Sequence, residues 1–288
     1  MKHSNGRKSR RTIDKEGGKR YNKGTVFSEN GKEIRMAKII AFANQKGGVG
    51  KTTSAINVAA SLGILGKKVL LIDLDPQGNC SSGVGIDKAN LKLSVYDVLM
   101  ERAKAEEVII KTKFENLWVL PSEVALAGAE IELADSPHRQ NSLKCAILPL
   151  EDQFDYILMD CPPSLGLLTL NGLVASQQII VPMQCEFFAL EGLSQLMVTV
   201  DLVRKHYNPA LSLGGVILTM YDGRLNLSLA VATELKKYFA DRIFRNTVPR
   251  NVRLSEAPSH GKPVYYYDKN SKGAQSYLAI AQELEKRN

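Results

Sequence analysis

The sequence is poor in the features that mark membrane, secreted and metal-binding proteins. No stretch of its 288 residues approaches the roughly 18 consecutive apolar residues of a membrane-spanning helix. The first residues are polar and basic, without the apolar segment of a secretory signal. The four cysteines (Cys80, Cys145, Cys161 and Cys185) form no CxxC pair, and the four histidines show no metal-ligand spacing. These absences predict a cytoplasmic protein with reduced thiols, no structural metal and no membrane partner.

Basic charge is concentrated in one terminal segment. Residues 1–35 contain eleven Lys and Arg against four Asp and Glu, a net charge of +7 out of +8 for the whole chain. The segment has too few apolar residues to offset the entropy of ordering it, so we predict that it is disordered. Because Met36 directly precedes the first apolar run, residues 1–35 are either a leader upstream of the true start or an additional arm that binds polyanions.

From Met36 onward, apolar runs of strand length alternate with helical segments. The expected strands span residues 38–44, 68–73, 117–121, 154–160, 178–183, 214–219 and 242–248. The expected helices include residues 52–65, 123–134, 190–206, 226–239 and 272–286. Near-continuous Ile, Val and Leu runs are typical of parallel strands covered on both faces, and their alternation with helices predicts a doubly wound, mostly parallel α/β sheet. Without an internal repeat or linker, residues 36–288 are predicted to form one domain.

A glycine-rich loop separates the first expected strand from the first expected helix. It reads Lys46-Gly47-Gly48-Val49-Gly50-Lys51-Thr52-Thr53. Glycines let successive backbone N–H groups turn toward phosphate oxygens, and the helix N-terminus adds partial positive charge. Lys51 would reach the β- and γ-phosphates of ATP, and the Thr52 hydroxyl would ligate Mg²⁺. The usual motif fails at Gln45, which replaces its first glycine, so a turn without ligand is the alternative; the flanking strand and helix favour ATP.

Carboxylates close two further strands. Asp73 and Asp75 end the second expected strand, and Asp160 ends the fourth. Ligands of open α/β sheets bind at the carboxyl ends of the strands. Asp160 follows four apolar residues, where a carboxylate is costly to bury unless a cation meets it, so we predict that it supports Mg²⁺. Asp73 and Asp75 lie on opposite sides of the strand, so one is expected to face the γ-phosphate; a structural cap is the alternative role for each.

Together these segments resemble the ParA/Soj family of chromosome-partitioning ATPases, within the MinD-like group that has a deviant Walker A loop. The resemblance runs from Met36 to the C-terminus, through KGGVGKTT, LLIDLDPQGN, DCPPSLGLLTLN, QCEFFALEGLSQL and PRNVRLSEAPSHGKP. It implies an ATP-bound homodimer in which Lys46 reaches the phosphates of the partner subunit, while Asp75 orients the attacking water. A cation supplied in trans in this way raises hydrolysis rates by about 10³–10⁵. The resemblance also implies contacts from Pro249 and Asn251 to the nucleotide base.

The same resemblance implies nonspecific binding of double-stranded DNA by the dimer, nucleoid association, and stimulation of hydrolysis by a ParB-like partner. Residues 222–253 carry seven basic and three acidic residues, and Arg224 and Arg253 match the DNA-contacting arginines of the family. Each neutralised phosphate adds about 0.9 to the salt slope of binding, and dimerisation doubles the number of phosphates that the protein neutralises. The region has no helix-turn-helix pattern or interleaved aromatics, so base readout is not expected. A solvated basic face is the alternative.

Three rival functions remain open. A MinD-like membrane-positioning ATPase needs a basic amphipathic C-terminal helix with bulky apolar anchors, whereas residues 277–288 have little apolar bulk. A bacterial tyrosine kinase fits the cluster Tyr265-Tyr266-Tyr267 superficially, but these tyrosines precede a further helix, which favours a strand or packing role. A nitrogenase-type reductase needs bridging cysteines, and Cys161 does not offer the expected spacing.

Overall fold

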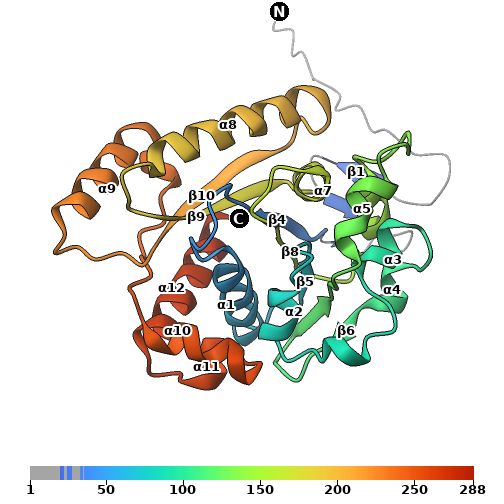
Figure 1. The fold of residues 1–288 in the computed structure, drawn as a ribbon, viewed down its shortest axis with the longest axis horizontal. Helices are drawn as coiled ribbons and strands as arrows, with labels where there is room; N and C mark the ends of the chain where they lie inside the picture. The colour runs from blue at the N-terminus through green and yellow to red at the C-terminus, as the bar shows by residue number, and fades with distance from the viewer. Residues whose placement is uncertain (1–19, 23–24, 28–32, 35) are drawn as a thin grey trace, which may run out of the picture.

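A central seven-stranded sheet organises the chain from residue 36 onward (Figure 1). The computed structural model describes residues 20–22, 25–27, 33–34 and 36–288. The strand order is β10-β9-β4-β8-β5-β7-β6, and every neighbouring pair is parallel except β6 with β7. The strands are β4 Lys38–Phe42, β5 Val69–Asp73, β6 Ile110–Lys111, β7 Leu117–Leu120, β8 Tyr156–Asp160, β9 Gln178–Gln184 and β10 Ser212–Thr219. The predicted doubly wound, mostly parallel sheet is confirmed.

Alternation along the strands divides the core into two halves, because successive side chains of a strand point to opposite faces. On one face, Ile40 and Phe42 of β4 pack in one cluster with the helices α1 (Lys51–Ile64) and α12 (Lys272–Arg287). On the other, Ile39 and Ala41 pack with α7 (Leu167–Ala175) and α8 (Ala189–His206). All five residues of β5 are buried, which explains why its sequence is apolar without alternation.

The five predicted helices are all present, with small differences at their ends. The α-helices are α1 Lys51–Ile64, α2 Asn79–Gly83, α3 Val95–Leu99, α4 Ala105–Val108, α5 Leu126–Glu132, α6 Ser142–Ile147, α7 Leu167–Ala175, α8 Ala189–His206, α9 Asn226–Phe239, α10 Val252–Glu256, α11 Val264–Tyr267 and α12 Lys272–Arg287. Short 3₁₀ turns are η1 Lys88–Asn90, η2 Leu148–Leu150, η3 Ala240–Arg242 and η4 Ala257–His260. Within the described ranges, none of these helices combines the length and the hydropathy needed to cross a bilayer.

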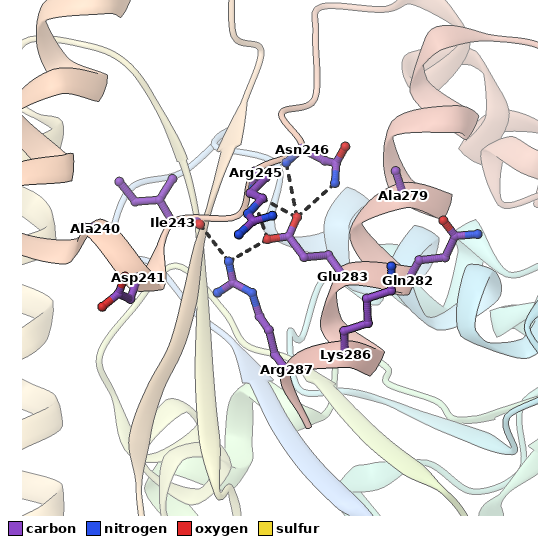
Figure 2. A pocket seen from close by; sticks show the side chains of 10 residues that line it. All are labelled: Ala240, Asp241, Ile243, Arg245, Asn246, Ala279, Gln282, Glu283, Lys286 and Arg287. Atoms are coloured by element: carbon purple, nitrogen blue, oxygen red, sulfur yellow. Dashed lines mark hydrogen bonds and ion pairs between the residues drawn. The ribbon is translucent and has the colours of Figure 1, made fainter.

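The predicted strand over residues 242–248 is wrong. The segment forms no ladder with β10: it makes one isolated bridge, between Val216 and Ile243, and two separate backbone hydrogen bonds, from Phe244 to Val216 and from Val248 to Leu218. The Glu283 carboxylate of α12 accepts hydrogen bonds from the backbone N–H groups of Arg245 (3.0 Å) and Asn246 (3.3 Å) (Figure 2). A ladder to β10 would use the N–H groups of Phe244, Asn246 and Val248 in turn, and the Asn246 N–H donates instead to a side chain from a distant helix.

Three short strands precede this domain. They are β1 Arg20–Asn22, β2 Thr25–Phe27 and β3 Glu33–Ile34, which pair antiparallel in a separate sheet. The rest of the segment that we predict to be disordered (1–19, 23–24, 28–32 and 35) lies outside the described residues. Its disorder, and its separation from the domain at residue 36, stay predictions.

Candidate active site

The glycine-rich loop between β4 and α1 has the backbone that its sequence predicts. Gly48 and Gly50 adopt left-handed φ angles of +73° and +83°, which side chains disfavour. The loop is held from two neighbouring strand ends: the Gln184 amide donates to the Gly48 carbonyl (2.9 Å), and the Thr219 hydroxyl donates to the Val49 carbonyl (2.8 Å). Loop carbonyls therefore face the protein, while the first N–H groups of α1 have no intrahelical acceptor. This arrangement suits an anion above the helix N-terminus.

The two loop lysines have opposite environments. Lys51 is buried, and its ammonium donates to the Lys46 carbonyl (3.0 Å). Burial lowers the pKa of Lys51, against the opposing effects of Asp160, Asp75 and Cys161. The Lys46 side chain is 48% exposed and forms an ion pair with Glu186, which follows β9. One lysine thus lies inside the site, and the other is available at the surface.

Asp160, at the end of β8, is a buried carboxylate that meets no donor at full hydrogen-bond geometry among the described residues, although the Thr52 hydroxyl lies near enough to favour its ionised form. Within the described part of the chain, neither of its oxygens has a donor in bonding geometry. Burial, followed by the Asp73 carboxylate, raises the pKa of Asp160 well above its usual value, while Thr52 and Lys51 act to lower it. Two orphaned oxygens beside a threonine hydroxyl are hard ligands of the kind that Mg²⁺ takes, with water and phosphate completing the shell. Asp160 and Thr52 therefore fit a magnesium site.

The two aspartates after β5 differ sharply. Asp73 is fully buried, and its carboxylate accepts hydrogen bonds from the backbone N–H and hydroxyl of Ser81 (both 2.7 Å) and from the Asp75 N–H (3.2 Å). Burial raises the pKa of Asp73 to about 6, although these hydrogen bonds oppose the rise. The Asp75 side chain is only partly buried and accepts from the Gln77 N–H (2.9 Å). The Asp73 carboxylate is thus fully engaged in hydrogen bonds within the fold, whereas the Asp75 carboxylate is partly exposed to solvent.

A cavity of about 520 Å³ opens beside the loop and brings distant segments together. Among its lining residues are Gly50, Thr53 and Thr219 from the loop side and Pro249 and Asn251 from the segment before α10. The Asn251 Oδ1 atom is buried and has no hydrogen-bond partner among the described residues. Pro249 and Asn251 therefore line the same cavity as Gly50 and Thr53, and their contact with a nucleotide base stays a prediction.

Comparison with known proteins agrees with this geometry. Residues 37–213 match a family model described as an AAA domain. The chain is 55% identical over 249 residues to the sporulation initiation inhibitor protein Soj of Bacillus subtilis, which covers 86% of this chain and 98% of the relative. The chain belongs to the ParA/Soj family of chromosome-partitioning ATPases. This confirms the resemblance found in the sequence.

Two further relatives of this ParA/Soj chain extend the comparison. The chromosome-partitioning ATPase Soj of Treponema pallidum is 50% identical over 249 residues, or 86% of this chain and 97% of the relative. Cobyrinic acid a,c-diamide synthase from Mycobacterium smegmatis, solved with a bound ATP analogue and magnesium, superposes with a TM-score of 0.75 at 37% identity. The superposition covers 87% of this chain and 95% of that one.

The arginines predicted to bind DNA are both ion-paired. Arg224, in the turn before α9, is 89% exposed and pairs with Asp222 (2.7 Å). Arg253, on α10, pairs with Glu256 (2.8 Å) and Asp268 (3.3 Å). Two other basic residues of the ParA/Soj chain, Arg245 and Lys286, line a cavity of about 710 Å³ between the 240–246 segment and α12 (Figure 2). Within the residues that the structure describes, neither side chain forms an ion pair, and the neighbouring Glu283 carboxylate pairs with Arg287 (2.7 Å).

Sequence reasoning missed the residues that hold the loop. Gln184 and Thr219 are the last residues of β9 and β10, and Met220 next to Thr219 adopts a left-handed φ of +49°. All three lie at the carboxyl edge of the sheet, where the rule that identified Asp73 and Asp160 applies equally. Gln184 and Thr219 could therefore have been identified as polar residues at the ends of apolar strands. The left-handed conformation of Met220 could not be predicted from the sequence, because non-glycine residues rarely adopt it.

Proposed function

We propose that this ParA/Soj-family ATPase is a nucleotide-controlled dimer for chromosome or plasmid partitioning. It binds ATP and Mg²⁺ in the loop, pairs with a second copy in the ATP state, and binds double-stranded DNA nonspecifically as a dimer on the nucleoid. Hydrolysis, stimulated by a ParB-like DNA-binding protein, separates the copies. The observation that carries the proposal is the pair of loop lysines, one buried within the site and one half exposed at its rim.

The residues inside the site bind and polarise the triphosphate. The N–H groups from Gly47 to Thr53 and the buried Lys51 ammonium take the phosphate oxygens, and Pro249 and Asn251 contact the base. Thr52 and Asp160 hold Mg²⁺, which neutralises charge on the β- and γ-phosphates when bound. The unpaired Asp160 carboxylate supports this role, because its burial is costly without a cation.

Lys46 acts on the partner subunit. A buried lysine cannot leave its own site, but Lys46 is exposed and held only by a surface ion pair with Glu186, of a kind worth about 0–1 kcal/mol. In a face-to-face dimer its ammonium neutralises charge that develops on the phosphates of the other copy. Asp75 orients the attacking water with its accessible oxygen, since the Asp73 carboxylate is already occupied.

DNA binding follows from the basic surface. The guanidinium groups of Arg224 and Arg253 are each oriented by a hydrogen bond to a neighbouring carboxylate. Each group has further N–H donors that can bind a phosphate oxygen. Contacts of this kind carry no base information, which fits nonspecific binding. Two copies double the number of phosphates contacted, so DNA affinity depends on the ATP-driven pairing.

Size-exclusion chromatography with ATP, ADP and no nucleotide tests the pairing. With ATP and Mg²⁺, Asp75→Ala should elute at twice the monomer mass and stay bound to DNA, because hydrolysis no longer separates the copies. Lys46→Ala should bind ATP but elute as a monomer. The matched control is Lys92→Ala, which removes an exposed lysine far along the chain from the loop and should behave as the parent.

A monomeric Asp75→Ala protein saturated with ATP and Mg²⁺ would overturn the dimer switch. If Lys46→Ala paired as well as the parent, the exposed lysine would have no role in trans. Neither result would contradict the proposed ATP-binding site, which is tested separately by binding of a fluorescent ATP analogue.

A further inference from the structure

Three buried polar residues and the backbone of Asp75 close a ring of hydrogen bonds. The ring joins the turn after β5, the start of α2 and the turn after β7. Its members are Asp73, Asp75, Ser81 and Ser122. Asp73, Ser81 and Ser122 are each 0% exposed.

Each member of the ring bonds to the next. The Asp73 carboxylate accepts from the Asp75 N–H (3.2 Å) and from the Ser81 hydroxyl (2.7 Å). The Ser81 hydroxyl oxygen accepts in turn from the Ser122 N–H (3.0 Å). The Ser122 hydroxyl closes the ring by donating to the Asp75 carbonyl (2.8 Å). The Asp75 N–H is therefore held by Asp73, two residues earlier in the same turn. The Asp75 carbonyl accepts from the local Gly78 N–H (2.9 Å) and, across segments, from the Ser122 hydroxyl.

The ring fixes a residue whose side chain must stay free. The Asp75 carboxylate accepts only the local bond from the Gln77 N–H within the described residues, so the fold does not hold it by the side chain. Its position depends instead on its backbone, which the ring holds at two points. A misplacement of about 1 Å in a catalytic group costs about 10²-fold in rate, so backbone anchoring of this kind has a direct kinetic consequence.

The turn that carries Ser122 is itself anchored. The Val95 N–H donates to the Pro121 carbonyl (2.8 Å), and the Ser94 hydroxyl donates to the Glu123 carboxylate (2.8 Å). Ser94 is the N-cap of α3 and bonds the Tyr96 N–H (3.2 Å). Ser122 is thus the link between the Asp75 turn and a rigid block formed by β7 and α3.

We propose that Ser122, through its hydroxyl and with Ser81 behind it, is a positioning residue that sets the place of Asp75 for hydrolysis. This inference rests on the proposed role of Asp75 in orienting water. It adds a second requirement for turnover, located on a different strand from the loop and from Asp160. ATP binding does not use the ring, so the effect falls on kcat and not on KM.

Steady-state hydrolysis by the full chain tests the proposal with an isosteric pair at one position. Ser122→Thr keeps the hydroxyl and Ser122→Val replaces it with a methyl group of nearly the same size, so any packing cost is shared. We expect the Val variant to have a kcat at least tenfold below that of the Thr variant, with KM values within about twofold. Equal kcat values would overturn the proposal.

A double variant separates positioning from general structural damage. If Ser122 acts through Asp75, then Asp75→Ala with Ser122→Val should hydrolyse ATP no more slowly than Asp75→Ala alone. An additional tenfold loss in the double variant would contradict the proposal. The control is Ser176→Ala, which removes a buried hydroxyl that donates to the Gly172 carbonyl (2.6 Å) and is no member of the ring, so it should keep the parent kcat.

Failure of this inference is distinguishable from failure of the proposed function. If Asp75→Ala itself retains parental hydrolysis, the role of Asp75 is wrong and the ring has no catalytic purpose. If Asp75→Ala is inactive while the Thr and Val variants at position 122 are equal, the switch stands and only the positioning role of Ser122 falls.

Discussion

Some buried polar groups in this protein carry a desolvation cost that no hydrogen bond among the described residues offsets. Asp160 is the clearest case, since a fully buried carboxylate without a hydrogen bond destabilises the fold that contains it. Natural sites commonly hold such groups at the expense of stability. If Asp160 supports Mg²⁺ as we propose, binding of Mg²⁺ with ATP should offset this cost and stabilise the protein.

Asp160→Asn tests this trade. Because the variant removes a buried charge, we expect its melting temperature without ligand to equal or exceed that of the parent by a few degrees. Addition of Mg²⁺ and a non-hydrolysable ATP analogue should raise the melting temperature of the parent and leave the variant almost unchanged. Differential scanning fluorimetry measures both shifts.

The control for this experiment is Asp155→Asn, which alters an aspartate at the start of the same strand. Asp155 accepts from the Lys68 N–H (2.8 Å) at the surface, away from the loop. It should retain the full stabilisation by ligand. A large ligand shift in Asp160→Asn would remove Asp160 from the magnesium site.

From the sequence we could propose as site residues those whose residue type and position in a motif by themselves imply a chemical role. Lys51, Thr52 and Asp160 follow from a glycine loop and an apolar strand that ends in a carboxylate. Ser122 could not be predicted in this way, because a serine in a turn is ordinary and its partners, Ser81 and Asp75, are about forty residues away along the chain. Only the parallel pairing of β5 with β7 brings them together.

At the scale of elements, the Glu283 side chain accepts backbone hydrogen bonds from a segment that the sequence predicts to be a strand. The segment 242–248 has the composition of a strand and makes two strand-like bonds to β10, from Phe244 to Val216 and from Val248 to Leu218 (both 2.9 Å). Between these bonds, Glu283 takes the N–H groups of Arg245 and Asn246 (Figure 2). Local propensity cannot reveal this, since the competing acceptor comes from a helix almost forty residues away. The long helices, by contrast, were predicted well because their apolar periodicity extends over many turns.

The Glu283 contact gives this region a defined pH dependence. Burial raises the pKa of Glu283, but hydrogen bonds from Arg245, Arg287 and Asn246 together outweigh it, so its pKa lies below the usual value of 4.5. A carboxyl group whose pKa is depressed on folding contributes stability above its unfolded pKa and loses it as the pH falls through the folded value. The contribution should be complete at pH 7 and vanish in strong acid.

Thermal unfolding of Glu283→Gln at several pH values measures this contribution. At pH 7 we expect the variant to be less stable than the parent by about 1–3 kcal/mol, the usual range for hydrogen bonds to a charged group. The difference should shrink as the pH falls below about 4.5. Glu285→Gln on the same helix breaks only a surface pair with Lys67 and should show a much smaller effect. A gap that is constant with pH would contradict the assignment.

For the whole molecule, charge is divided between the terminal segment and the domain. Residues 1–35 carry nearly the entire net charge, whereas the domain offers local basic patches on a nearly neutral surface. The two make separable contributions to DNA binding, because each phosphate neutralised adds to the salt dependence.

The salt slope of DNA binding in the presence of ATP separates the two contributions. Arg253→Glu should abolish ATP-dependent retention on DNA while ATP binding stays normal. Deletion of residues 1–35 should keep the ATP dependence and reduce the slope by about 0.9 for each phosphate that the segment neutralises. An unchanged slope would favour a leader upstream of the true start, and parental retention by Arg253→Glu would remove that arginine from the DNA surface.

Both borders of the central sheet are closed against further strands. On one side β6 is only two residues long and runs antiparallel, and on the other the 242–248 segment covers β10. Such edges give a second copy little backbone with which to extend the sheet. The ATP-state pairing that we propose would then use other surfaces of the domain, and two copies could separate without breaking a shared β-ladder.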